Sequence, residues 1–222
     1  MERRVGRMNL KKLVTAAVCT MLMATVAFTA GCGGEKKSDK KVLKVGMECA
    51  YAPYNWSQTK ADGGAVKIAG SNEYAYGYDV MMAKKLADSM GADLEIQKIE
   101  WDGLAPAVVS GKIDAAIAGM SITSKRKETV DFTKPYYYAT VVALVKKDSE
   151  QAKAQSVADL KGSVATSQLN TIWYDQIDQV PDVKKLPAID TVPGMIVALT
   201  SGKCNLIVTD IPTAKAAAFA NP

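Results

Sequence analysis

The chain has 222 residues, of which 48% are apolar, 23% charged and 7% aromatic, which fits a globular protein of one or two domains and argues against disorder. It contains no histidine, which excludes serine–histidine catalysis and histidine-ligated zinc within this chain. Residues 1–31 carry a net charge of +4, whereas the remaining residues carry 23 basic and 22 acidic side chains. Because this near-neutral remainder offers no large positive surface, we expect no nucleic-acid partner.

The first 31 residues have the pattern of an export signal. A basic stretch, Arg3 to Lys12, precedes the uncharged apolar run Leu13 to Ala30. The alternative is a retained membrane-spanning helix, because such a run is nearly long enough to cross a bilayer. The sequence Thr29-Ala30-Gly31-Cys32 resembles a bacterial lipobox, although Thr29 stands where leucine is usual. The resemblance implies cleavage before Cys32, acylation of its thiol and attachment to a membrane.

Residues 32–41 are polar and predict a tether that follows this anchor. Beyond the signal and the anchor, only Cys49 and Cys204 remain. One disulfide between them is possible, but two separate, partly buried thiols are favoured because no disulfide framework exists. Neither cysteine has the spacing of a metal ligand, and we expect no metal site and no cofactor.

Residues 42–145 predict a first lobe in which strands and helices alternate. The expected strands are rich in apolar or β-branched residues and comprise 42–47, 94–99, 113–118 and 138–145. The expected helices are 79–90, with Asp79 as its N-cap and Gly91 at its end, and 102–111. A loop with several glycines and Pro53 separates the first strand from the first helix.

Residues 146–222 predict a second, partial lobe, which begins with a charged linker at Lys146 to Lys153. Ser156-Val157-Ala158-Asp159 fits a capping box at the start of a short helix. The further elements alternate in type and comprise strands 163–167, 183–188 and 204–209 and helices 171–179, 192–201 and one from about 212.

An internal echo relates the two lobes. Residues 107–119 align with residues 198–210 at a constant offset of 91, with identical Ala, Ser, Gly and Lys at four positions. Each copy is a helix, a Ser-Gly-Lys turn and a buried strand, and a chance match between two ordinary αβ units is the alternative. Since ligands bind beyond the carboxyl ends of strands in open α/β sheets, the ends at Gly119 and Asp210 predict a cleft between two lobes.

The residues at these strand ends suit a zwitterionic ligand. Arg126 offers a planar fork for a carboxylate, Ser121 offers a hydroxyl, and Asp210 offers an acceptor for an ammonium group. Each has a structural alternative: Lys125-Arg126-Lys127 could be a solvated charge run, and Asp210 could cap the helix that follows it. The aromatic residues available to cover the body of such a ligand are Tyr51, Tyr54, Tyr76 and Tyr78.

These motifs together resemble the family 3 bacterial solute-binding proteins, the polar amino-acid receptors of ABC importers. The resemblance covers nearly all of residues 42–222 and is most specific in residues 77–137. Its motifs are Gly77-Tyr78-Asp79-Val80, in which Met81 follows where an acid is usual, Trp101-Asp102-Gly103-Leu104, the run from Gly111 to Arg126, and the run from Val130 to Tyr137. It implies a periplasmic-binding-protein-like α/β fold of type II, in which two lobes enclose the ligand cleft.

The resemblance also implies roles for single residues. Arg126, helped by Ser121, would hold the α-carboxylate of an amino acid. The backbone of Gly119 and the side chain of Asp210 would hold its α-ammonium group. Tyr51 and Tyr78 would flank the side chain of the ligand.

Glu48 stands where related receptors for basic amino acids carry an acid. In the second lobe, Ser167, Asn170 and Thr171 occupy the segment that meets the ligand at a helix N-terminus. This sequence departs there, since Leu169 replaces a common glycine and Trp173 a common acid. Family members also continue past the strand that ends at Asp210, so the second lobe and its C-terminal return are expected to be incomplete.

The expected function is an extracytoplasmic, lipid-anchored receptor, a monomer without catalytic residues. It would capture a polar or basic amino acid by hinge closure and deliver it to the permease of an ABC transporter. One alternative is an enzyme like the cyclohexadienyl dehydratases, with Glu48, Asp210 or Glu73 as the acid–base group. Another is a sensor or surface interaction module on the same fold.

Overall fold

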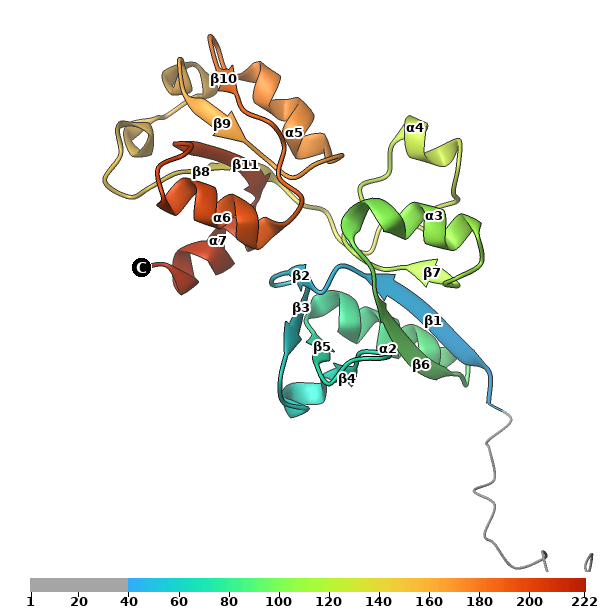
Figure 1. Ribbon diagram of the computed structural model, residues 1–222. Helices are drawn as coiled ribbons and strands as arrows, with labels where there is room; N and C mark the ends of the chain where they lie inside the picture. Colours follow the sequence, from blue (N-terminus) through green and yellow to red (C-terminus); the bar gives the residue numbers. More distant parts are fainter. Residues whose placement is uncertain (1–39) are drawn as a thin grey trace, which may run out of the picture. The chain divides into compact units, whose positions relative to one another are not determined.

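The computed structural model describes residues 40–222, so the signal pattern, Cys32 and most of the predicted tether lie outside the described residues. Its first sheet is parallel, in the order β6-β1-β7 (Figure 1). These strands are β1 (Val42–Met47), β6 (Asp93–Lys98) and β7 (Ala115–Ala116). Central β1 buries Leu43, Val45 and Met47, and a Cβ at Gly46 would lie 2.4 Å from Ile113. Of the run predicted as strand 113–118, only Ala115 and Ala116 form strand β7, although Asp114 and Ile117 also donate their N–H groups to β1 carbonyls.

The loop predicted after the first strand contains an antiparallel sheet in the order β2-β3-β5-β4. Its elements are β2 (Ala50–Tyr51), β3 (Asn55–Gln58), the 3₁₀ turn η1 (Asp62–Gly64), β4 (Val66–Lys67) and β5 (Tyr74–Tyr76). This sheet leads directly into the first helix of the lobe.

Helix α2 (Tyr78–Ser89) starts one residue before the prediction, and the prediction that Asp79 caps it is wrong. Gly77, with φ of 127°, occupies the N-cap position, where a Cβ would lie 2.3 Å from the Tyr54 carbonyl oxygen. Asp79 lies inside the first turn with its side chain fully buried. Its carboxylate accepts hydrogen bonds from Asn55 and Tyr136 instead of capping the helix. The first lobe is completed by η2 (Trp101–Gly103), α3 (Leu104–Val109) and α4 (Ser124–Lys127).

The second sheet has the order β10-β9-β11-β8, with β8 antiparallel to β11 and the others parallel. Its strands are β8 (Val141–Leu144), β9 (Val164–Thr166), β10 (Lys184–Lys185) and β11 (Leu206–Asp210). The surrounding helical elements are η3 (Glu150–Lys153), η4 (Val157–Leu160), α5 (Ile172–Gln176), η5 (Ile177–Gln179), α6 (Val192–Thr200) and α7 (Ile211–Ala220) (Figure 1).

The pairing of strand β8 places the boundary between the lobes earlier in the chain than the sequence predicted. We expected the first lobe to run to residue 145, but β8 pairs with β11 from Val141 to Leu144. By sheet membership the chain therefore crosses between the lobes before Val141. Antiparallel pairing of an apolar strand cannot be assigned to one sheet or the other from its composition alone.

The cores of the two lobes meet at the first lobe's antiparallel sheet. Tyr51 and Tyr54 come from the β2 region but pack into the cluster of buried residues around β11 and α6. In this cluster the Tyr51 and Trp173 rings lie 5.8 Å apart. Cys49 and Cys204 are free, buried thiols, as favoured. Over residues 40–222 we find no helix both long and apolar enough to cross a membrane.

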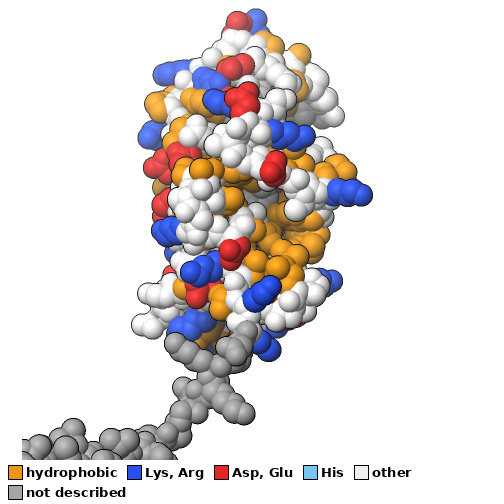
Figure 2. Space-filling view, turned by 90° about the vertical axis from the view of Figure 1, so that its right-hand side faces the viewer, with side chains coloured by type: hydrophobic (Ala, Val, Ile, Leu, Met, Phe, Trp, Pro, Cys, Tyr) orange, Lys and Arg blue, Asp and Glu red, His pale blue; other side chains and the backbone are white. Residues whose placement is uncertain are grey.

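The surface of the described residues carries charges of both signs. Figure 2 shows basic and acidic side chains interspersed over one face, with hydrophobic side chains gathered beside them. No large area of a single sign is visible on that face, in agreement with the near-neutral sequence.

Candidate functional site

A small cavity lies between the two lobes and is lined by residues from both. Its volume is about 10 Å³. The first lobe contributes Glu48, Tyr51, Trp101, Ala118, Gly119, Ser121 and Arg126, and the second contributes Gln168, Thr171, Ile172 and Trp173. Glu48 and Gly119 come together because β1 and β7 are parallel neighbours whose carboxyl ends meet at one edge. The cavity thus unites six of the predicted site residues: Glu48, Tyr51, Gly119, Ser121, Arg126 and Thr171.

Glu48 is a buried carboxylate that follows β1 directly and has 4% of its surface exposed. Burial raises its pKa to about 7, an effect opposed by the hydrogen bond from Gln168 and reinforced by the charge of Glu100. Gln168 donates from Nε2 to both carboxylate oxygens at 3.1 Å and to the Asp190 carbonyl at 3.0 Å. A carboxylate held with this little solvation would bind a cationic group strongly.

Arg126, on α4, also lines the cavity. Its guanidinium donates to the carbonyl of Ser121 at 2.7 Å and to that of Asn170, in the second lobe, at 2.8 Å. It also lies over the Trp101 ring, 5.3 Å from the ring centre. Burial lowers its pKa from the ordinary value, while the charge of Asp175 acts in the opposite direction. The alternative of a solvated charge run fits the exposed Lys125 and Lys127 but is wrong for Arg126.

Asp210 is fully buried and both of its carboxylate oxygens are engaged. Oδ1 accepts the Thr213 N–H at 2.8 Å and so caps α7, which confirms the structural alternative. Oδ2 accepts the Tyr51 hydroxyl of the first lobe. Burial, with the charge of Asp210 and this bond, raises the pKa of Tyr51 far above its usual range. Asp210 is not among the residues that line the cavity, so its role toward an ammonium group stays a prediction.

Three further predicted residues, Ser167, Asn170 and Tyr78, do not line the cavity. The buried Ser167 hydroxyl donates to the Val208 carbonyl at 2.6 Å. Asn170, with φ of 55°, donates its amide to Asp102 at 2.9 Å. Tyr78 is 37% exposed and donates to the Tyr136 carbonyl at 3.1 Å. Thr171, which does line the cavity, also caps α5 by accepting the Tyr174 N–H.

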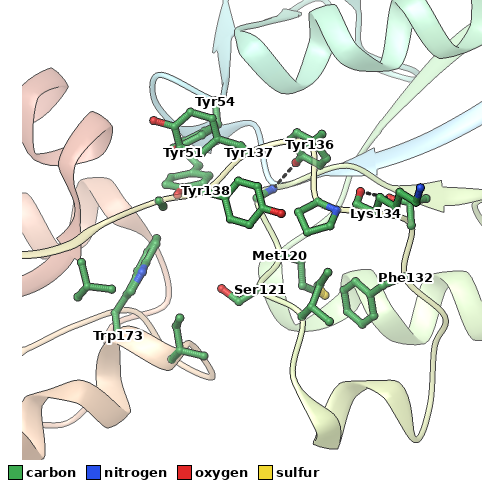
Figure 3. A pocket seen from close by; sticks show the side chains of 17 residues that line it. Tyr51, Tyr54, Met120, Ser121, Phe132, Lys134, Tyr136, Tyr137, Tyr138 and Trp173 are labelled. Carbon is green, nitrogen blue, oxygen red and sulfur yellow. Dashed lines mark hydrogen bonds between the residues drawn. The ribbon is translucent and has the colours of Figure 1, made fainter.

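A larger cavity of about 260 Å³ adjoins the first and shares Tyr51, Gly119, Ser121, Ile172 and Trp173 with it. Figure 3 shows its aromatic lining, with Trp173 projecting from the second lobe toward the tyrosines of the first. The Tyr51 and Tyr54 rings stack with centres 4.6 Å apart. Such rings cover the aliphatic part of a ligand and attract cations.

Sequence reasoning missed Trp101 and Gln168 as site residues and treated Trp173 only as a departure from a family pattern. Trp101 starts a quoted motif, and Gln168 lies between Ser167 and Asn170, so neighbouring signals existed. The signals could not show that these side chains face the cavity, because this depends on the segments that follow β6 and β9 meeting across the cleft.

The fold and this site define a two-lobed α/β protein with a cavity between its lobes. The chain belongs to the bacterial extracellular solute-binding proteins, family 3, whose model matches residues 43–185. Among known proteins it is 33% identical over 164 residues to the arginine-binding extracellular protein ArtP of Bacillus subtilis, covering 74% of this chain and 57% of ArtP. It is 30% identical over 202 residues to the ABC transporter arginine-binding protein 1 of Escherichia coli, covering 90% and 72%.

Solved structures support the predicted fold. The arginine-bound form of truncated ArgBP from T. maritima matches with a TM-score of 0.68 and 30% identity, covering 82% of this chain and 79% of that one. An ancestral arginine-binding protein bound to glutamine matches with a TM-score of 0.70 and 32% identity, covering 83% and 76%. The predicted periplasmic-binding-protein-like α/β fold is confirmed. The chain spans 57% and 64% of the length of the first two relatives, ArtP and a probable histidine-binding protein of Campylobacter jejuni.

Proposed function

We propose that this protein is an extracytoplasmic receptor that captures an amino acid with a cationic side chain and delivers it to an ABC permease. The observation that carries the proposal is that Glu48 and Arg126 line one cavity between the lobes. A basic amino acid presents a carboxylate and a side-chain cation, which match these two charges. Relatives named as arginine-binding and histidine-binding proteins support this choice.

Arg126 would bind the α-carboxylate as a bidentate partner, with Ser121 beside it. In the described state its guanidinium donates to two backbone carbonyls, and a carboxylate would be the stronger acceptor. The Gly119 backbone, with Asp210 as predicted from the family, would meet the α-ammonium group. Glu48 would meet the side-chain cation, for which its low solvation is suited.

Hinge closure would follow from bonds that the ligand makes to both lobes. The described contacts across the cleft run from Gln168 to Glu48 and from Arg126 to Asn170. A ligand that replaces these contacts with charge-paired ones stabilises the closed state over the open state. The second-lobe residues Ser167 and Thr171 remain predictions for this role.

A thermal-shift and calorimetry panel tests the proposal on the purified full chain, with arginine, lysine, histidine, glutamine and cystine as ligands. A ligand at 100 times its dissociation constant adds about 2.7 kcal/mol to the free energy of unfolding. We expect arginine or lysine to raise the melting temperature most. A cooperative melt that none of these amino acids shifts would contradict the proposal.

The Glu48→Gln variant tests the side-chain assignment. It should lose the preference for arginine over glutamine, because an amide cannot neutralise a buried cation. The matched control is Glu100→Gln, which removes an exposed carboxylate that influences Glu48 but does not line the cavity. Equal arginine preference in Glu48→Gln and wild type would contradict the assignment.

A catalytic role is the second candidate and has one supporting observation. With its pKa raised to about 7, Glu48 could donate a proton near neutral pH. We nevertheless propose a binding protein without enzymatic activity, since the named relatives above are binding proteins. Incubation with prephenate and arogenate, followed by chromatography, separates the two: product formation that Glu48→Gln abolishes would establish the enzyme.

We further propose that Cys32 carries the lipid anchor. The support is the lipobox-like sequence and the extracellular family. Cells that express the chain and are fed an alkyne fatty acid should label the wild type but not Cys32→Ser. Equal labelling of both would contradict the anchor.

A further inference from the structure

A buried chain of hydrogen bonds runs through the first lobe to the backbone of the cleft. The Cys49 N–H donates to Asn55 Oδ1 at 2.7 Å, and Asn55 Nδ2 donates to Asp79 Oδ2 at 2.7 Å. The Tyr136 hydroxyl donates to Asp79 Oδ1 at 2.8 Å. The Gly119 N–H in turn donates to the Tyr136 hydroxyl oxygen at 2.9 Å, as the dashed line in Figure 3 marks.

The direction of every proton in this chain is determined. Asn55 must use its oxygen for the Cys49 N–H, so its Nδ2 can only donate to Asp79. Tyr136 has a single hydroxyl proton and gives it to Asp79, which leaves its oxygen to accept from Gly119. Asp79 therefore has to accept on both oxygens, which a carboxylate does and an amide cannot.

Asp79 is fully buried and takes no part in capping its helix. Burial raises its pKa to about 6, and the hydrogen bonds from Tyr136 and Asn55 act against that increase. Burying a carboxylate is costly unless it is hydrogen-bonded, so these two bonds are what make the buried position tolerable.

The chain of hydrogen bonds ends at Gly119, which lines both cavities. Gly119 has φ of 63°, and a Cβ there would lie 2.8 Å from the Tyr51 ring. Tyr136 belongs to the segment that precedes the crossing to β8 and lines the larger cavity. The bond between them ties this segment to the ligand-facing backbone.

We propose that Asp79 is a positioning residue of the cleft: by orienting the Tyr136 hydroxyl, it holds the Gly119 backbone in the conformation that lines the cavity. The positioning is a property of the ligand-free protein. Its consequence for amino-acid affinity rests on the proposed function.

The test exchanges the donor and acceptor pattern. Asp79→Asn places a second amide nitrogen against Asn55 Nδ2, so two donors face each other. Adding Asn55→Asp restores every bond. The carboxylate then at position 55 accepts from the Cys49 N–H and from the amide nitrogen at position 79. The amide oxygen at position 79 still accepts from the Tyr136 hydroxyl.

Two further variants complete the set. The control is Asp88→Asn, which makes the same change at an exposed position on α2. Tyr136→Phe removes only the hydroxyl that accepts from Gly119, and it is used if Asp79→Asn does not fold. Tyr136→Phe removes the bonds that this hydroxyl makes to Gly119 and to Asp79 but keeps the Asp79 carboxylate and its bond from Asn55, so it tests the hydroxyl separately from the Asp79 side chain.

Two measurements on the full-length polypeptide distinguish the outcomes. The first is the Gly119 amide proton shift and exchange rate in glycine-labelled protein without ligand. The second is the arginine dissociation constant by calorimetry. We expect Asp79→Asn and Tyr136→Phe to expose the Gly119 amide to exchange and to weaken arginine binding about tenfold. The double variant should return within about threefold of the wild type, and Asp88→Asn should match it.

An unchanged Gly119 amide in folded Asp79→Asn or in Tyr136→Phe would overturn the proposal. A double variant as impaired as Asp79→Asn would also overturn it, because the hydrogen-bond pattern would then not be the cause. If the Gly119 amide follows the expected pattern but the wild type binds none of the amino acids, the positioning stands and the proposed function fails.

Discussion

The two αβ units of the internal echo have the same scaffold but different ends. The Ser-Gly-Lys turns both place glycine in the left-handed region, Gly111 at 71° and Gly202 at 80°. In the first unit Ile113 donates its N–H to the Ala107 carbonyl at 3.3 Å. In the second, the equivalent Cys204 donates to Ala198 at the same distance.

A side chain repeats this equivalence. Asp114 accepts the Lys44 N–H of the neighbouring strand at 2.7 Å, and the equivalent Asn205 accepts the Val164 N–H at 2.8 Å. Asp114 thus links the segment before β7 to β1, and Asn205 links the segment before β11 to β9. Matched hydrogen bonds at the constant offset argue against a chance similarity between ordinary αβ units.

The units differ where each strand ends. The first continues to Gly119, whose open backbone lines the cleft, and to Arg126. The second ends at Asp210, which caps α7 and accepts the Tyr51 hydroxyl. The comparison shows that the repeated scaffold supplies the strand ends, while a charged side chain that lines the cavity, Arg126, follows only the first unit.

The largest expected effect on ligand affinity comes from replacing Arg126, the charged residue that follows only the first unit. Arg126→Ala should weaken arginine binding by about 100-fold or more, because it removes a charge-assisted bidentate partner. Lys125→Ala, at an exposed neighbour, should leave the dissociation constant unchanged. Calorimetry measures both, and a similar small loss in the two variants would place the carboxylate site elsewhere.

The next effect is the pH dependence that Glu48 imposes on the first lobe. Its pKa of about 7 without ligand should fall when a cation binds, so binding releases a proton. Arginine should therefore bind about 30-fold more weakly at pH 5.5 than at pH 8. Glutamine binding, measured by the same calorimetry, should lack this weakening at low pH. An arginine affinity that is constant over this range would contradict the Glu48 assignment.

The raised pKa of Glu48 gives the stability of the ligand-free protein the opposite pH dependence: stability falls as the pH rises, whereas arginine binding strengthens. Because the folded-state pKa lies above the ordinary value of 4.5, the contribution of Glu48 to stability is complete below about pH 4.5 and is lost as the pH rises through 7. Glu48→Gln should therefore stabilise the ligand-free protein at pH 8, by about 3 kcal/mol at most, and little at pH 5. Urea unfolding at both values checks the sign.

A third comparison sets Gly119 against the equivalent Asp210. Gly119→Ala should weaken arginine binding about tenfold, because its Cβ would meet the Tyr51 ring and its φ is strained. Asp210→Asn retains a helix cap but removes the charge. If Asp210 binds the ammonium group, this variant loses affinity; if it serves the fold alone, affinity stays within about threefold. Calorimetry and urea unfolding together separate the two roles.

The smallest expected effect sharpens the scaffold comparison. Asp114→Ala and Asn205→Ala each remove one bond to a strand N–H, so each should lower the free energy of unfolding by about 1 kcal/mol. Urea unfolding measures the pair, with Asp88→Ala as an exposed control. A large cost for only one of them would show that the hydrogen bonds are alike in geometry but not in energy.

The sequence was informative where local signals are strong. The capping box at Ser156 and Asp159 is present, and the helices predicted around Val80 and Val192 form within a few residues of their expected bounds. Gly119 and Arg126 line one cavity, as the strand-end argument predicts, whereas Asp210 at the other strand end does not; Glu48, which only the family resemblance indicated, lines the same cavity. These features depend on periodicity, caps and the parallel order of strands.

Other features depend on contacts between distant segments. Aspartate at position 79 is a common helix-capping residue. Its carboxylate instead accepts hydrogen bonds from Asn55 and Tyr136, which are 24 and 57 residues away. Strand β8 could join either sheet until its pairing with β11 is known. Gln168 lies beside predicted site residues, but its own contact could not be predicted because its partner Glu48 is 120 residues distant.

The packing of Tyr51 against Trp173 gives the protein an intrinsic optical probe. Trp173 is 7% exposed, and Trp101 lies under the Arg126 guanidinium, so both indoles sit at the cleft. The proposed opening would bring the Trp173 indole into water and shift its emission to longer wavelength. Trp56, on β3, belongs to the antiparallel sheet and pairs instead with Tyr76. Ligand capture could thus be followed in real time by fluorescence of the unlabelled protein.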